Sequence, residues 1–258
     1  MKRRQLFRYA GLGLASALGA ASAARLPFAS AQGASSLRVR WLGHTCFLFE
    51  GSGKRILVNP FQPRGCTAGY SKPAVEADLV LASSHLLDEG ATDVVPGNPQ
   101  VFAQPGDYRF QGIQIQGVGI PHDQVGGRRL GTNVIWHWEQ GGVKIAHLGG
   151  AAAPIQTEQR ILIGRPDIAF IPVGNTANVY GAQQAQQALK TLKPKIAVPT
   201  HYRTDAAEDG NCDLDPLESF LQAVEGMDVR RPEADATVVS ASMLPAQGPK
   251  IWVMRYPS

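Results

Sequence analysis

The stretch Ala77-Asp-Leu-Val-Leu-Ala-Ser-Ser-His-Leu-Leu-Asp-Glu-Gly90 passes from an apolar run into a polar turn. The run at 79–82 has the length and composition of a short buried strand. The polar residues at 83–89 would then stand at the carboxyl end of that strand, where open α/β sheets commonly build their binding sites. We therefore take this turn as the first candidate for a functional site.

Strand and helix signals on both sides of the turn indicate a mixed protein. Hairpin signals dominate first, such as the Gly51-Ser-Gly53 turn, and apolar strands later alternate with helical segments. The expected strands are 37–43, 45–50, 54–59, 79–82, 101–102, 112–119, 133–139, 143–147, 167–173, 195–199, 238–242 and 251–255, and the expected helices are 154–163, 181–192 and 216–224. Periodicity alone predicts an α/β or α+β class.

Three further stretches share features with a known family: Trp41-Leu-Gly-His-Thr-Cys-Phe47, Ile56-Leu-Val-Asn-Pro-Phe61 and His147-Leu-Gly-Gly150. Together with the turn, they resemble the metallo-β-lactamase superfamily, in the branch that includes ascorbate-6-phosphate lactonase. The resemblance covers roughly residues 37–203. It implies an α/β (α+β) fold, an αββα sandwich of two mixed β-sheets flanked by helices, with residues 32–258 as a single domain.

The superfamily holds a pair of zinc ions with seven side chains, and the resemblance implies where these fall in this chain. The seven positions are Ser84, Leu86, Asp88, Glu89, His122, Gly150 and His201. Serine is a poor zinc ligand, leucine and glycine are none, and a glutamate in place of a histidine reaches farther. One metal position therefore keeps only His122. The other keeps Asp88, Glu89 and His201. Asn59 stands where the family usually has an aspartate.

The leading hypothesis from this pattern is an exported protein that has the fold but has lost most of its zinc ligands. Such a protein has no resident cofactor, is non-catalytic or weakly active, and binds a small molecule or an unidentified protein partner in an apolar pocket. The residues expected around that pocket are His44, Asn59, Ser84, His85 and Gly150. A related hypothesis is an interaction partner at the membrane surface with a vestigial pocket.

The alternative hypothesis is a working hydrolase with one zinc or other divalent ion. Three protein ligands suffice for a catalytic zinc site, and Asp88, Glu89 and His201 would supply them. His122 would orient water or stabilise a developing oxyanion, so Asp88 and His122 are the catalytic candidates. The substrate would be an ester, lactone or phosphoester, as the family implies. His85 lies one residue off the first motif position and would join the ligands only in a slipped turn.

Residues 1–31 have the character of a targeting segment. The run Lys2-Arg-Arg-Gln-Leu-Phe-Arg8 resembles a twin-arginine signal, residues 10–24 are rich in alanine and glycine, and Ala-Ser-Ala at 29–31 fits a cleavage site. We expect the twin-arginine translocase to export the folded protein to a periplasm or a thylakoid lumen. The alternative is an uncleaved membrane anchor.

The charge balance and the cysteines narrow the classes of partner and compartment. Five of the 25 basic residues and none of the 21 acidic residues lie in 1–31, which leaves 20 basic against 21 acidic residues. This near balance argues against nucleic-acid binding. Cys66 and Cys212 lie in loops and could pair in an oxidising compartment, whereas Cys46 is expected to be a buried thiol. The acidic run at 209–215 resembles a calcium loop but lacks its glycine and closing glutamate, so we expect a solvated loop.

Overall fold

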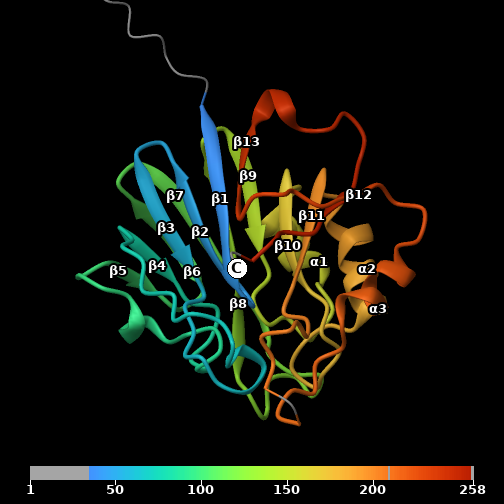
Figure 1. The fold of residues 1–258 in the computed structure, drawn as a ribbon. Coiled ribbons are helices and arrows are strands. Elements are labelled where there is room, and N and C mark those ends of the chain that lie inside the picture. Colours follow the sequence, from blue (N-terminus) through green and yellow to red (C-terminus); the bar gives the residue numbers. More distant parts are fainter. Residues whose placement is uncertain (1–34, 209, 257–258) are drawn as a thin grey trace, which may run out of the picture. The chain divides into compact units, whose positions relative to one another are not determined.

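Two mixed β-sheets pack against each other in the computed structural model, which describes residues 35–208 and 210–256 (Figure 1). The first sheet has the order β13-β1-β2-β3-β4-β5. Its strands are β1 (Ser36–Gly43), β2 (Cys46–Gly51), β3 (Lys54–Val58), β4 (Leu79–Leu81), β5 (Gln100–Phe102) and β13 (Ala236–Ser240). The signal peptide and cleavage site predicted at 1–31 lie outside the described residues.

The second sheet has eight strands in the order β12-β14-β11-β10-β9-β8-β7-β6. Its strands are β6 (Gly106–Phe110), β7 (Ile113–Pro121), β8 (Thr132–Gln140), β9 (Val143–His147), β10 (Ile168–Pro172), β11 (Ile196–Thr200), β12 (Val229–Arg230) and β14 (Lys250–Trp252). Strands β6 to β9 are antiparallel, and β9, β10, β11, β14 and β12 are parallel. The α/β sandwich predicted from the resemblance is therefore confirmed.

Helices α1 (Thr157–Ile163) and α2 (Ala182–Leu192) pack on strands of the second sheet and on each other, and α3 (Leu217–Ala223) packs on α2. The first sheet is covered differently, by loops with short 3₁₀ turns at Gly65–Thr67 and Thr92–Val94. These loops bury Phe61 and Val94 against Leu48, Leu57 and Val80 of the sheet. The outer layer on that side therefore needs no α-helix, because the loops already remove its apolar side chains from water.

Aromatic side chains between the two sheets form the centre of the core. The ring of Phe47 lies 4.6 Å from that of Phe170, and the ring of Phe49 lies 5.0 Å from that of Trp138, all in edge-to-face arrangements. Such pairs add to the free energy gained by burying apolar area. Because alternate residues of a strand face opposite sides, Phe47 and Phe49 enter this core while Cys46 and Leu48 enter the loop-covered layer. The burial predicted for the free Cys46 thiol is confirmed.

The structure differs from the expected elements in several places, and the strands expected at 238–242 and 251–255 end at Ser240 and Trp252. Strands β6 and β12 were not expected, because Gly-Asp-Tyr-Arg-Phe at 106–110 is too polar to show a strand pattern and β12 has only two residues. They form by pairing with β7 and β14, which is tertiary information. The helix expected at 154–163 begins only at Thr157. Among residues 35–208 and 210–256, we find no helix long and apolar enough to span a bilayer.

The pairing of Cys66 with Cys212, left open by the sequence, is present as a disulfide. It joins the loop after β3 to the loop after β11. Backbone bonds reinforce the junction: the amide of Gly69 donates to the carbonyl of Ala206 at 2.7 Å, and that of Glu208 donates to Gly65 at 3.0 Å. Two loops that are 146 residues apart in the chain are thereby held together.

Candidate functional site

Strands that run in the same direction deliver their following residues to one edge of the sandwich. His44 follows β1, Asp88 lies in the turn after β4, and His201 follows β11. His122 follows β7 and Gly150 lies just beyond β9. This is the position at which ligand sites form in α/β sheets, and the first-quoted stretch supplies its central turn.

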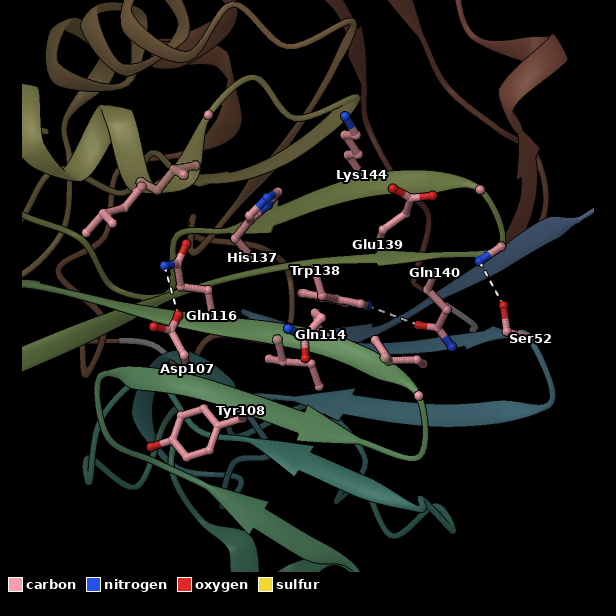
Figure 2. Close-up of a pocket in the computed structure, with 18 of the residues that line it drawn as sticks. Ser52, Asp107, Tyr108, Gln114, Gln116, His137, Trp138, Glu139, Gln140 and Lys144 are labelled. Carbon is pink, nitrogen blue, oxygen red and sulfur yellow. Dashed lines mark hydrogen bonds between the residues drawn. The ribbon is translucent and has the colours of Figure 1, made fainter.

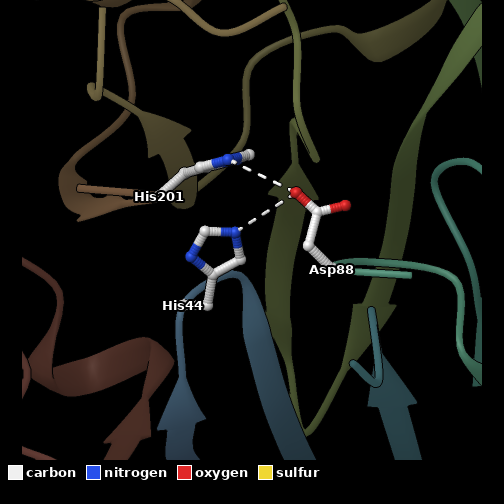
Figure 3. A group of neighbouring side chains, drawn as sticks. All are labelled: His44, Asp88 and His201. Carbon is white, nitrogen blue, oxygen red and sulfur yellow. Dashed lines mark ion pairs between the residues drawn. The ribbon is translucent and has the colours of Figure 1, made fainter. Parts of the chain in front are cut away.

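His44, Asp88 and His201 converge on a small volume, and we call them the metal group (Figure 3). The carboxylate oxygen Oδ2 of Asp88 lies 3.7 Å from Nε2 of His44 and 3.9 Å from Nε2 of His201. One ligand atom from each residue lies within 4.8 Å of the others. Among the described residues this is the one group of three or more metal-ligating side chains that meets this distance. The spacing suits three ligands around one divalent ion.

The two histidines of the metal group are buried, and their ring nitrogens are largely without hydrogen-bond partners in the part of the chain that the structure describes. His44 is 2% exposed and His201 is 3% exposed. Both ring nitrogens of His44 and Nδ1 of His201 lack a partner among the described residues. Buried polar groups are normally satisfied, because an unpaired one costs about 1–3 kcal/mol. Nitrogens left in this state beside a carboxylate therefore fit a cation that would accept their lone pairs.

The protonation states of the metal group also suit a cation. Burial, together with the neighbouring His44 ring, holds the pKa of His201 well below its ordinary value. Burial tends to raise the pKa of Asp88, but its contacts with His44 and His201 outweigh this and lower it below the ordinary range. A neutral imidazole and an ionised carboxylate are the forms that bind metal.

Unusual backbone conformations aim these histidines inward. His44 and His201 both have positive φ angles, of 53° and 54°. Such values are uncommon for residues other than glycine, and they persist only where the surroundings enforce them. The indole Nε1 of Trp41 donates to the carbonyl of His44 at 3.0 Å. Gly43 has a φ of 105°, and a Cβ there would come within 2.7 Å of the Tyr70 ring. The tight turn after β1 therefore needs this glycine.

Beside the metal group lies a second cluster, formed by Glu89, His122 and Ser84. Glu89 and His122 are fully buried, and Oε1 of Glu89 lies 3.0 Å from Nε2 of His122 in an ion-pair contact. The hydroxyl of Ser84 donates to the same oxygen at 2.8 Å, and Nδ2 of Asn59 lies 3.4 Å from Oε2. Burial alone would lower the pKa of His122, but the Glu89 carboxylate outweighs it and raises the pKa above the ordinary value.

Gly150 borders this second cluster and leaves no room for a side chain. A Cβ at this position would lie 2.6 Å from Nε2 of His122 and 2.9 Å from Oε1 of Glu89. The amide of Gly150 donates to Oδ1 of Asn133 at 3.0 Å, which fixes the backbone. The space that the side chain of the family's metal-bridging aspartate would need is thus taken by the side chains of His122 and Glu89.

His147 connects the two clusters, and sequence reasoning assigned it no role. Its Nε2 lies 3.0 Å from the carbonyl of Thr45, and its Nδ1 accepts from the amide of Gly149 at 3.2 Å. Burial, only partly offset by the bond to Thr45, lowers its pKa to about 3. A neutral imidazole therefore bridges the turn that carries His44 and the turn that carries Gly150. The signal available in the sequence was the His-Leu-Gly stretch itself.

The structure brings together part of the ligand set expected from the sequence. Asp88 and His201 lie in one group, and His44, which was expected only in the pocket, joins them as the third member. The carboxylate of Glu89 is not in that group, because consecutive residues of the turn point in different directions and Glu89 faces His122. Its amide donates to the carbonyl of Leu86 at 3.1 Å, which closes the turn.

The remaining expected residues lie around the second cluster or outside it. Asn59 has a φ of 53°, and its Oδ1 accepts from the amide of Ser83 at 2.9 Å. His85 is exposed, with its Nε2 lying 3.4 Å from the side-chain Nε2 of Gln104. Leu86 contributes its amide, which donates to Oγ of Ser84 at 3.1 Å. The turn is therefore not slipped in a way that would bring His85 to the metal group.

Two cavities lie near or beyond the site. One of about 310 Å³ lies beside the turn and is lined in part by Ser84, His85 and Leu86. A larger one of about 990 Å³ lies over β6 to β9 and the end of α1, with polar residues such as Gln116 and Glu139 along it (Figure 2). Neither cavity is lined by a residue of the metal group. A small molecule beside the turn would thus contact Ser84 and His85 first.

Comparison with known proteins places this geometry in a family. The model of the β-lactamase superfamily domain matches residues 38–201. A UPF0173 metal-dependent hydrolase of Thermococcus onnurineus is 31% identical over 193 residues, which cover 65% of this chain and 85% of the relative. A UPF0173 metal-dependent hydrolase of Thermus thermophilus is 30% identical over 197 residues, which cover 65% of this chain and 84% of the relative.

Solved structures agree with this assignment. A Thermotoga maritima protein, assigned as a Zn-dependent hydrolase of the metallo-β-lactamase superfamily, superposes with a TM-score of 0.67 at 29% identity and covers 86% of this chain and all of its own. A metallo hydrolase of Ignicoccus hospitalis has a TM-score of 0.56 at 18% identity over 80% of this chain and 99% of its own, which shows the fold alone. The chain belongs to the metallo-β-lactamase superfamily, among relatives named as metal-dependent hydrolases.

Proposed function

We propose that this chain is an exported hydrolase that uses a single divalent metal ion held by His44, Asp88 and His201. The observation that carries the proposal is the convergence of these three side chains with buried imidazole nitrogens left unpartnered. The relatives named as metal-dependent hydrolases support the metal requirement. Of the hypotheses drawn from the sequence, this is the working hydrolase with one metal ion, with His44 in place of Glu89 as the third ligand.

The chemistry available to such a site follows from its neighbours. A bound divalent ion supplies Lewis acidity and lowers the pKa of bound water. His122 stands beside the group, where the Glu89 carboxylate and, to a lesser degree, that of Asp88 outweigh burial and raise the pKa of His122. Because its pKa is raised, His122 can carry a proton near neutral pH and donate a hydrogen bond to a developing oxyanion or leaving group. Glu89 holds the His122 imidazole in place, and Ser84 in turn donates a hydrogen bond to the Glu89 carboxylate.

The substrate class is proposed from the family alone: an ester, a lactone or a phosphoester. The site would act on a bond presented at the carboxyl edge of the two sheets. The cavity beside Ser84 and His85 offers room for the remainder of a small substrate. The proposed substrate is a small molecule and not a nucleic acid.

A second candidate function is the non-catalytic one, in which the site binds a small molecule or a protein partner without turnover. The observation that favours it is the loss of ligand chemistry at Ser84, Leu86 and Gly150, together with Glu89 facing His122 instead of the metal group. It requires that the metal group holds no ion under native conditions.

Export is proposed on two features. The segment at 1–31 resembles a twin-arginine signal, and the disulfide between Cys66 and Cys212 is of a kind that persists in oxidising compartments. Replacing Arg3 and Arg4 together by lysine should retain the protein in the cytoplasm of a host with twin-arginine translocase. Unchanged export of that variant would contradict this part of the proposal.

One experiment separates the two candidate functions. Protein purified from its native compartment is assayed for zinc, manganese and iron, and then for hydrolysis of ester, lactone and phosphodiester probes before and after chelation. We expect about one ion per chain, since one three-ligand group is present, and activity that is lost on chelation and restored by the same metal. Metal-free protein that binds none of these ions on reconstitution would leave the non-catalytic function in its place.

A further inference from the structure

The second cluster has a feature that ligand counting does not explain. The space that a side chain at position 150 would occupy is taken by Nε2 of His122 and the carboxylate of Glu89. Both of these side chains are fully buried. The space beside the Gly150 backbone is therefore filled by protein atoms.

The cluster also neutralises its own charge. Glu89 brings a carboxylate 3.0 Å from the imidazole of His122, and Ser84 donates a hydrogen bond to the same carboxylate oxygen. The amide of Leu86 holds the serine hydroxyl in turn, at 3.1 Å. A buried carboxylate is tolerated only when it is paired and hydrogen-bonded in this way. The Glu89 carboxylate therefore has the partners that a buried charge needs without a cation, whereas the two ring nitrogens of His122 make no well-aligned hydrogen bond within the described residues.

We propose that Glu89 and His122, held by Ser84, form a metal-free carboxylate–imidazole subsite that occupies the place of a second cation, so that this chain takes one divalent ion and excludes another. The number of ions rests on the proposed function. The packing of Glu89 and His122 against Gly150 does not, because it concerns only side chains of this protein.

A packing cycle tests the occupied volume. Gly150→Ala should lower the Tm of metal-free protein by about 3–10 °C, because the added methyl group must displace both His122 and Glu89. In a Glu89→Ala background the imidazole can move into the vacated space, and the same change should lower the Tm by no more than about 2 °C. Glu89→Gln keeps the volume, so Gly150→Ala should again be costly in that background. Gly119→Ala is the matched control, because its Cβ would meet only carbon atoms of Pro105 and Thr132, at 3.1 and 3.3 Å.

Zinc titration of the full chain tests whether a second ion is excluded. Metal-free wild-type protein titrated with zinc should bind one equivalent tightly, and the Gly150→Ala and Glu89→Gln variants should also bind one. Two tight equivalents in the wild type would overturn the inference, as would an equal Tm loss for Gly150→Ala with and without the Glu89 side chain. If Glu89→Ala shows no melting transition, the Glu89→Gln background and the zinc count decide. Binding of no zinc would instead contradict the proposed function, and the packing cycle would still test the subsite.

Discussion

The metal group and the Glu89–His122 pair are adjacent halves of one site that treat buried charge differently. In the metal group, two imidazoles face one carboxylate and leave nitrogens unpartnered. In the pair, one imidazole faces one carboxylate that also receives a serine hydroxyl. The same turn supplies both carboxylates, Asp88 and Glu89, in consecutive positions. Unpartnered imidazole nitrogens occur in both halves, so the halves differ in how many ligands converge: two histidines approach Asp88, and only His122 approaches Glu89.

The largest expected effect breaks the metal-group half. Asp88→Ala should lower metal affinity and kcat/KM by more than about 100-fold, because losing a ligand costs more than losing a residue that only orients one, which typically costs roughly 10–100-fold. Metal content and hydrolysis are measured on the same preparations. His85→Ala is the control, since His85 is exposed and contacts Gln104 instead of the metal group. Full metal occupancy in Asp88→Ala would show that the ion binds elsewhere.

The next effect breaks the other half. Glu89→Ala should lower the free energy of unfolding of metal-free protein by about 3–5 kcal/mol, because it leaves His122 and Ser84 buried without their partner. Urea denaturation measures the change. Glu50→Ala removes an ion pair with Arg38 that is partly exposed on both sides, and it should cost no more than about 1 kcal/mol. Equal costs for the two variants would mean that the buried pair contributes nothing beyond a surface pair.

A smaller effect is expected from removing the disulfide, which supports the metal-group half of the site. Replacing Cys66 and Cys212 by serine should lower the free energy of unfolding by about 2–4 kcal/mol. The disulfide joins two loops that border the site. One carries Tyr70, whose ring packs against Gly43 beside His44, and the other follows His201. The hydroxyls of Tyr70 and Thr204 lie 2.6 Å apart across the same junction. Metal affinity should therefore weaken in the serine variant, as measured by zinc titration. Added reductant should lower the zinc affinity of the wild type and leave that of the serine variant unchanged. An unchanged zinc affinity of the wild type would contradict this role of the disulfide.

The smallest effect concerns the residue that connects the halves. His147 has a folded pKa of about 3 against an ordinary value of 6.5, so the unfolded chain binds the proton in between. Stability from this group is present above about pH 6.5 and is lost as the pH falls toward 3, by up to about 1.4 kcal/mol per pH unit. His147→Gln should flatten this slope in metal-free protein, as followed by urea denaturation between pH 7.5 and 4.5. Identical slopes in both proteins would assign the loss to other groups, such as His201.

Much of the fold could be predicted because its signals are local. The hairpin at 51–53, the apolar strands and the proline-stopped helix at 182–192 each depend on neighbouring residues. The edge strands β6 and β12 could not be predicted in this way, since their polar or very short sequences form strands only through a partner. Family resemblance supplied the arrangement of the sheets, which no periodicity contains.

Within the site, Asp88 and His201 could be predicted from motif positions, and the role of His44 could not. The Gly-His-Thr stretch marked His44 as a pocket residue, but its approach to Asp88 depends on a positive φ and on Trp41 holding its carbonyl. Glu89 was also expected in the metal group, whereas its carboxylate faces His122. Motif spacing treats consecutive ligands alike, whereas a tight turn sends their side chains to different neighbours.

The sequence by itself determined which side chains exist: the histidines of the site, two adjacent carboxylates, a glycine where the family has an aspartate, and two cysteines able to pair. Only the tertiary structure decided how the donors are shared, with Asp88 beside two histidines and Glu89 beside one. The physical reason is that covalent order sets chemical identity, while distance and burial set electrostatic partnership. Those distances arise where the ends of strands far apart in the chain meet.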